Sequence, residues 1–308
     1  MIFSQLAKTT FTFLVIAAIA IGLLRLQFLK KTEFLTQAEI SKVSRFPQIK
    51  FLPQNVNNLP PPKLSASAIL VVDLNSDTLL FEKNSNLKVV PASLTKLATA
   101  ILVLEKCQPD QIITVPQIAT PPGTKVGLVK GERISVENLL YGLLLPSGND
   151  AANVLSITCY SSFDHFLSSM TNLTQKLNMI NTQFNNPSGL PAKNQFTTAA
   201  DLLKLTKTFL VDQRLSAIVS TREKIVTDVS GKISHKLVNL NKLLENPKVL
   251  GVKTGTTVTG ENLITLKGDN SQKIVVILLQ SQDRFGETQE IFGWIEQNFR
   301  WQAQIIGE

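Results

Sequence analysis

The sequence predicts an α/β domain of the α+β type, in which an antiparallel sheet of about five strands is backed by a cluster of helices. Two short apolar, β-rich runs lie near the start of the folded region, and three more lie near its end. The segments between them have helical patterns. The five runs are residues 68–72, 78–81, 249–253, 262–267 and 273–279. Strands at both ends with helices between them indicate one sheet assembled from the two termini.

Four segments between the strands are predicted helices, and another helix follows the last strand. Thr197 or Thr198 could cap the fourth helix, and Pro146 ends the second. The last helix carries Ile291 and Ile295 on one face. The four internal helices are residues 93–105, 136–145, 163–177 and 197–210.

Composition argues against two classes of function. The net charge is +8, but the lysines are dispersed and accompany no nucleic-acid-binding motif, so we expect no nucleic acid partner. The chain has two cysteines, Cys107 and Cys159, and two histidines, in no metal-binding motif. We therefore expect two separate, buried thiols, and neither a metal nor another cofactor.

The N-terminal residues 1–30 contain an apolar run from Phe11 to Leu29 with few interruptions. Its only Ala-x-Ala sequence lies inside the run, where a signal-peptide cleavage site is not expected. We therefore predict an uncleaved membrane anchor, with a removed signal peptide as the alternative. Residues 31–64 are polar, end in three prolines and are predicted as an extended linker, or alternatively as an arm packed on the domain. Residues 65–303 then form a folded domain, which we expect outside the cytoplasm.

The first candidate motif is Ser93-Leu94-Thr95-Lys96. Residues three apart on a helix share a face, so the hydroxyl and the amine can meet. Serine becomes a nucleophile when a base takes its proton, and a buried lysine can be that base. Spacing alone is weak, because Ser85 and Lys88 have the same spacing without a predicted helix.

The second candidate motif is Ser147-Gly148-Asn149, which follows the helix ended by Pro146. Ser147 could relay a proton between the lysine and a leaving nitrogen. Asn149 can both donate and accept hydrogen bonds to a substrate amide. By itself, the motif is equally consistent with a helix-terminating turn.

The third candidate motif is Lys253-Thr254-Gly255, at the end of a predicted strand. A cation and a hydroxyl on a strand suit a terminal carboxylate. Gly255 lets a substrate backbone lie against the strand as an added neighbour, and the Thr256 N–H is a candidate oxyanion donor. An ordinary strand end is the alternative explanation.

The three motifs together, in this order, resemble those of the low-molecular-mass penicillin-binding proteins, specifically the D-alanyl-D-alanine carboxypeptidases. The resemblance runs from about Ala66 to Trp301 and implies a β-lactamase/transpeptidase-like fold. The amino-acid sequence matches that of the family closely in four segments, PASLTKL at 91–97, LLLPSGNDAA at 143–152, NPSGL at 186–190 and GVKTG at 251–255.

The resemblance also implies roles. Ser93 would form the acyl-enzyme, Lys96 would be its base, and Ser147 with Asn149 would complete the proton network. Substrates would be peptidoglycan stem peptides ending in D-Ala-D-Ala, and β-lactams would be covalent inhibitors. The residues implied to hold the terminal carboxylate are Lys253 and Thr254, with Arg284 as a further contact. Many relatives have a histidine where this chain has Gln195 and Phe196.

Three other functions remain open. A D,D-endopeptidase of peptidoglycan cross-links would use the same residues. A serine β-lactamase needs a carboxylate for the deacylating water, and the E-x-x-L-N loop that supplies it is missing. A non-catalytic protein that only binds wall peptides could lose the nucleophile or the base, but both are present.

Overall fold

The computed structural model describes residues 18–28, 30, 48–117, 121–160, 162–269 and 272–306. The chain divides into two units, one of residues 51–302 and one of residues 1–50 with 303–308. In the latter, residues 18–28 and 30 are helical. Among the described residues, no helix has both the length and the hydropathy of a bilayer span. Residues 1–17 of the predicted anchor and 31–47 of the predicted linker lie outside the described residues.

The unit of residues 51–302 is built on an antiparallel five-stranded sheet in the order β3-β2-β10-β9-β8. The central strand β10 places Ile277 opposite Leu70 of β2 and Ile264 of β9. Strands from the two ends of the domain therefore pair in one sheet, which confirms the predicted architecture. The bounds are β2 (Ala68–Asp73), β3 (Thr78–Lys83), β8 (Val249–Thr257), β9 (Gly260–Gly268) and β10 (Lys273–Ser281).

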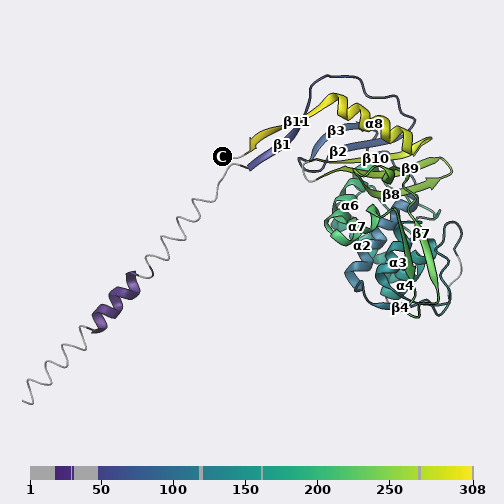
Figure 1. Cartoon of the computed structure of the whole chain (residues 1–308), viewed down its shortest axis with the longest axis horizontal. Coiled ribbons are helices and arrows are strands. Elements are labelled where there is room, and N and C mark those ends of the chain that lie inside the picture. The colour runs from purple at the N-terminus through teal and green to yellow at the C-terminus, as the bar shows by residue number, and fades with distance from the viewer. Residues whose placement is uncertain are drawn as a thin grey trace, which may run out of the picture. The chain divides into compact units, whose positions relative to one another are not determined.

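Helices cover both faces of the sheet (Figure 1). Ile69 and Val71 of β2 pack in a cluster with Ile291 of α8 (Arg284–Asn298). Leu70 and Val72 belong to a second cluster with the remaining helices. Successive side chains of a strand point to opposite faces, so β2 is apolar throughout because both of its faces are covered. Burying each such side chain contributes roughly 1.5–3 kcal/mol.

The second face carries the four internal helices that the sequence predicts, together with two that it does not. Thr198 caps α6, since its Oγ1 accepts a hydrogen bond from Asp201 N at 3.1 Å. The helices α4 and α7 and the hairpins β4–β5 and β6–β7 are additions to the prediction. The bounds are η1 (Ala92–Thr95), α2 (Lys96–Lys106), β4 (Ile112–Thr114), β5 (Arg133–Ser135), α3 (Val136–Leu144), α4 (Asn149–Cys159), α5 (Phe163–Lys176), α6 (Ala199–Val211), α7 (Gln213–Ser220), β6 (Glu223–Thr227), β7 (Ser234–Val238) and η2 (Lys242–Glu245).

Part of the predicted linker packs against the domain. Strand β1 (Gln48–Asn55) pairs with β11 (Phe299–Ile306). Beyond it, Trp294 Nε1 of α8 donates to Leu59 O at 3.0 Å, and Lys83 Nζ donates to Leu64 O at 3.0 Å. Leu59 and Leu64 therefore contact α8 and β3, respectively.

Cys107 and Cys159 form a disulfide with an S–S distance of 2.03 Å, so the prediction of two separate thiols is wrong. Cys107 directly follows α2, and Cys159 is the last residue of α4. These helices pack against each other, which brings their C-terminal ends together. A separation of 52 residues without a shared motif gave no sign of this pairing.

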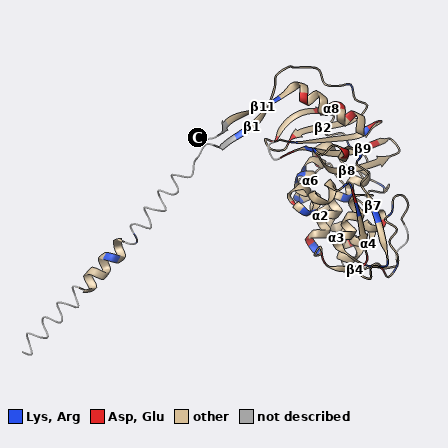
Figure 2. Cartoon of the chain, viewed as in Figure 1, with Lys and Arg blue, Asp and Glu red and all other residues tan. Residues whose placement is uncertain are grey.

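Charged residues are spread over the sheet and the helices (Figure 2). Lys176 and Glu105 approach to 3.9 Å with both side chains exposed, an arrangement that contributes little to stability. This distribution agrees with the dispersed basic charge of the sequence.

Candidate active site

The first motif lies where η1 passes into α2. Lys96 is the first residue of α2, and its Nζ lies 3.0 Å from Ser93 Oγ. Ser93 is partly exposed, whereas Lys96 has an exposed fraction of 0%. The hydroxyl can therefore meet a substrate while the amine beside it is shielded from water. The similarly spaced Ser85 and Lys88 lie outside any helix.

The turn before Lys96 is held against the sheet by Asn262. This buried residue of β9 donates from Nδ2 to Val90 O at 3.0 Å and Pro91 O at 3.3 Å. Its Oδ1 accepts a hydrogen bond from Gln280 N at 2.9 Å. Asn262 was not a predicted site residue, because its partners are backbone groups far away in the chain.

The second motif joins α3 to α4. Ser147 has a positive φ of 64°, and Asn149 is the first residue of α4. Asn149 Oδ1 accepts a hydrogen bond from Lys96 Nζ at 2.7 Å. Ser147 Oγ is buried and has no hydrogen-bond partner within the described part of the chain. It is thus an unused hydroxyl two residues before Asn149 in the chain.

A third acceptor for Lys96 comes from the turn at residues 186–190. Ser188 O accepts a hydrogen bond from Lys96 Nζ at 2.7 Å. Asn186 Oδ1 holds this turn by accepting from Ser188 N at 3.2 Å and Gly189 N at 2.7 Å. Gly189 has a φ of +80°, and a Cβ on it would lie 1.8 Å from Ala92 O, so only glycine allows the turn to approach η1 this closely.

The surroundings of Lys96 favour a neutral amine. Burial and the charge of Lys253 lower its pKa well below the ordinary value, and the negative charge of Asp150 opposes them. A neutral amine has two N–H donors and one lone pair. If the donors bind Asn149 Oδ1 and Ser188 O, the lone pair is left for the Ser93 hydroxyl proton.

The third motif lies on β8, at one edge of the sheet and packed against η1. Lys253 and Thr254 are buried, and Thr256 is exposed. A Cβ on Gly255 would lie 3.2 Å from Ala92 Cβ. Burial, followed by the charge of Arg284, lowers the pKa of Lys253 to about 7.

Arg284, the first residue of α8, reaches the same strand. Its Nη1 donates to Gly255 O at 2.9 Å and to Thr256 Oγ1 at 3.2 Å, and its Nε lies 3.6 Å from Glu261 Oε2. Burial lowers the pKa of Arg284. The structure thus gathers Ser93, Lys96 and Asn149 by hydrogen bonds, and Arg284 with residues 255–256 by another set.

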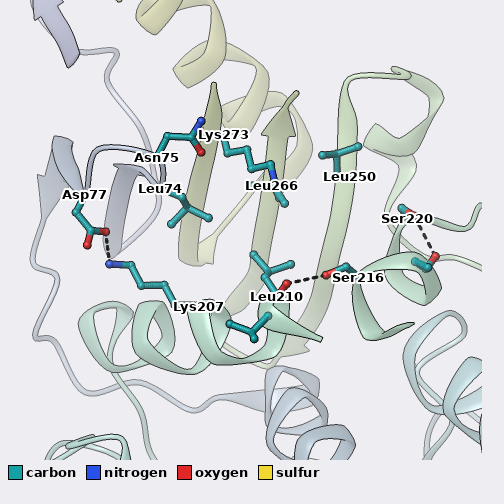
Figure 3. Close-up of a pocket in the computed structure, with 12 residues that line it drawn as sticks. Leu74, Asn75, Asp77, Lys207, Leu210, Ser216, Ser220, Leu250, Leu266 and Lys273 are labelled. Atoms are coloured by element: carbon teal, nitrogen blue, oxygen red, sulfur yellow. Dashed lines mark hydrogen bonds and ion pairs between the residues drawn. The ribbon is translucent and has the colours of Figure 1, made fainter. Parts of the chain in front are cut away.

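A separate cavity of about 560 Å³ lies between the sheet and α6–α7 (Figure 3). Leu210, Leu250 and Leu266 contribute apolar walls, and Lys207 pairs with Asp77 at its side. None of the predicted site residues lines it. The candidate site is therefore identified by its hydrogen bonds and buried lysines.

The chain is similar to known proteins over most of its length. The family model described as D-alanyl-D-alanine carboxypeptidase matches residues 55–282. The D-alanyl-D-alanine carboxypeptidase DacF of Bacillus subtilis is 29% identical over 221 residues, which cover 69% of this chain and 57% of that protein. DacC of Escherichia coli, described by the same activity, is 30% identical over 251 residues, which cover 76% of this chain and 62% of that protein. The chain thus spans less than two thirds of the length of both relatives.

A solved structure extends the likeness to three dimensions. The crystal structure of penicillin binding protein 6B from Escherichia coli matches with a TM-score of 0.71 and 26% identity, over 81% of this chain and 87% of that chain. This confirms the penicillin-binding, transpeptidase-like fold that the resemblance implied. Since the family model covers most of residues 51–302, the chain belongs to the D-alanyl-D-alanine carboxypeptidase family of peptidases.

Proposed function

We propose that this protein removes the terminal D-alanine from peptidoglycan stem peptides through an acyl-enzyme on Ser93. The observation that carries the proposal is the buried Lys96 amine, 3.0 Å from Ser93 Oγ and bonded to two further acceptors. A desolvated amine of lowered pKa is neutral at a lower pH than an ordinary lysine and can therefore take the serine proton.

In the acylation step, Ser93 Oγ attacks the carbonyl carbon of the peptide bond between the two D-alanines. Its proton passes to Lys96 Nζ, and the N–H groups of Ser93 and Thr256 stabilise the oxyanion. Lys96 then passes this proton through Ser147 to the leaving nitrogen, the bond to that nitrogen breaks, and D-alanine departs, which leaves Lys96 neutral. The buried hydroxyl of Ser147 has no hydrogen-bond partner among the described residues, which supports this relay, because it can bind the leaving nitrogen.

In the deacylation step, water attacks the ester carbonyl and gives its proton to Lys96. The bond to Ser93 Oγ breaks, and the shortened peptide leaves as a carboxylic acid, which loses its proton to the solvent. The proton held by Lys96 returns to Ser93 Oγ, so the enzyme ends as it began. Besides the substrate, the cycle consumes one water molecule.

We assign substrate binding to the edge of β8. A peptide added beside this edge strand would place its C-terminal carboxylate near the Lys253 ammonium and the Thr254 hydroxyl, with Arg284 as a further cation. The Asn149 side chain would hold the peptide amide. A bound carboxylate would also favour the charged form of Lys253, which burial disfavours.

We further propose that the domain acts outside the cytoplasm, anchored by residues 1–30. The disulfide between Cys107 and Cys159 supports an oxidising compartment, since such bonds are rare in the cytosol. The contacts of residues 51–64 with α8 and β3 support a folded domain that begins before residue 65.

Mass spectrometry of a stem peptide ending in D-Ala-D-Ala, incubated with the protein, tests this function. We expect loss of one alanine, with no loss from the Ser93→Ala variant. Cleavage of a cross-linked dimer with an untouched monomer would instead establish the endopeptidase. Rapid turnover of nitrocefin would establish a β-lactamase.

A further inference from the structure

The Asp150 carboxylate is buried and has no part in the proton path described above. It has an exposed fraction of 5% and accepts four backbone hydrogen bonds. One comes from the next residue in α4, Ala151. The other three come from the segment of residues 122–128, with Val126 N at 2.9 Å, Gly127 N at 2.8 Å and Leu128 N at 3.2 Å.

The same segment determines the orientation of the Asn149 amide. Asn149 N donates to Thr124 O at 2.8 Å, and Asn149 Nδ2 donates to Pro122 O at 2.7 Å. Gly123 lies so close that a Cβ on it would be 3.0 Å from Asn149 Nδ2. Because the amide nitrogen is bound to Pro122 O, the amide oxygen faces Lys96, which donates to it at 2.7 Å.

We propose that Asp150 is a positioning residue for acylation, which holds residues 122–128 across the start of α4 so that Asn149 presents its oxygen to Lys96. The inference rests on the proposed function of Ser93 and Lys96. An amide at position 150 would replace one accepting oxygen by a donor, which would face backbone N–H groups that also donate. The segment would lose its anchor and Asn149 its fixed orientation.

Asp150 also acts on Lys96 through its charge. The charged groups that influence the pKa of Lys96 are Lys253 of β8, which lowers it, and Asp150 of α4, which raises it. Loss of the carboxylate charge therefore lowers the pKa of Lys96 further. Since acylation requires the neutral amine, the rate rises as pH passes through this pKa, and the acid limb of the profile moves to lower pH.

The test measures the second-order rate of Ser93 acylation by a fluorescent penicillin, as a function of pH, in three variants. Asp150→Asn should lower the maximal rate about 100-fold, the loss expected from a small misplacement of reacting groups, and should shift the acid limb to lower pH. Asp150→Glu keeps the negative charge but has a longer side chain. It should therefore lower the maximal acylation rate and leave the acid limb of the pH profile at the wild-type pH.

Asp201→Asn is the matched control. Asp201 is also a buried carboxylate in the first turn of a helix, and it accepts from Asn181 N at 2.8 Å and Thr182 Oγ1 at 3.0 Å. It should lose stability but keep the wild-type rate and profile.

If folded Asp150→Asn has the maximal acylation rate and the acid limb of the wild type, the inference is overturned. The proposed function would still be upheld in that case, provided that the wild type is acylated and releases D-alanine. If Asp150→Asn does not fold, a wild-type rate in Asp150→Glu would overturn the inference in the same way. A wild-type protein that neither reacts with penicillin nor releases D-alanine would overturn the proposed function and this inference together.

Discussion

The disulfide between Cys107 and Cys159 joins the C-terminal ends of two helices whose N-terminal ends carry Lys96 and Asn149. Lys96 Nζ and Asn149 Oδ1 lie 2.7 Å apart, so α2 and α4 are connected at both ends. The covalent link restricts the separation of the two helices and thereby supports the hydrogen bond at their other ends.

Removal of this link should lower the stability of the domain. A loop of 52 residues closed by a disulfide loses chain entropy in the unfolded state, which stabilises the fold by about 4 kcal/mol. We expect the Cys107→Ser/Cys159→Ser double variant to have a free energy of unfolding lower by about this amount, measured by urea denaturation. As a control, a reductant should destabilise the wild type and leave the double variant unchanged. Equal stability of wild type and variant would contradict the prediction.

Replacement of Ser93 by alanine should abolish covalent labelling by a fluorescent penicillin. The fold should survive, because Lys96 retains its bonds to Asn149 and Ser188. Ser85→Ala is the matched control, since Ser85 also precedes a lysine by three residues but lies outside any helix. Its labelling should equal that of the wild type. Labelling of a folded Ser93→Ala variant would show that the nucleophile is another residue.

The sequence predicted those parts of the site that depend on side chains in short motifs. Ser93 and Lys96 are three residues apart, so local geometry alone brings them together. The sequence could not predict the Ser188 carbonyl as an acceptor for Lys96. Every residue has a backbone carbonyl, and the direction of this one depends on the conformation of the turn. The disulfide was missed for a related reason, since the packing of α2 on α4 is a property of the tertiary fold.

The sheet was predictable because its strands are short and apolar and lie at both ends of the domain. The helix α4 was not predictable, because Ser147-Gly148-Asn149 resembled a simple turn. The hydrophobic pattern of the residues that follow is only weakly amphipathic. The hairpin β6–β7 was missed because only Val226, His235 and Leu237 of its ten paired residues are buried.

The dependence of kcat/KM on pH should show the titration of Lys253. The proposed carboxylate contact needs the ammonium form, and the pKa of Lys253 in the free enzyme is lowered to about 7. We therefore expect kcat/KM for a D-Ala-D-Ala peptide to fall as pH rises through about 7. Lys253→Arg remains charged, so its alkaline limb should lie at higher pH, even with a lower maximal rate. Lys193→Arg, at an exposed position, is the control and should retain the wild-type profile. An alkaline limb that is the same in Lys253→Arg and wild type would assign the titration to another group.

Substitution of Gly189 should disrupt the site through the backbone. A Cβ there would lie 1.8 Å from Ala92 O and 2.9 Å from Thr95 Oγ1, so either the turn at 186–190 or η1 must move. The Ser188 carbonyl would then lose its position beside Lys96, and we expect Gly189→Ala to slow acylation by penicillin about 100-fold. Gly231→Ala separates this effect from backbone strain, because Gly231 also has a positive φ, of +72°, but has open space around its Cβ position. That control should lose about 1–2 kcal/mol of stability and acylate at the wild-type rate. Equal acylation rates in the two variants would mean that the contact between the turn and η1 does not position Lys96.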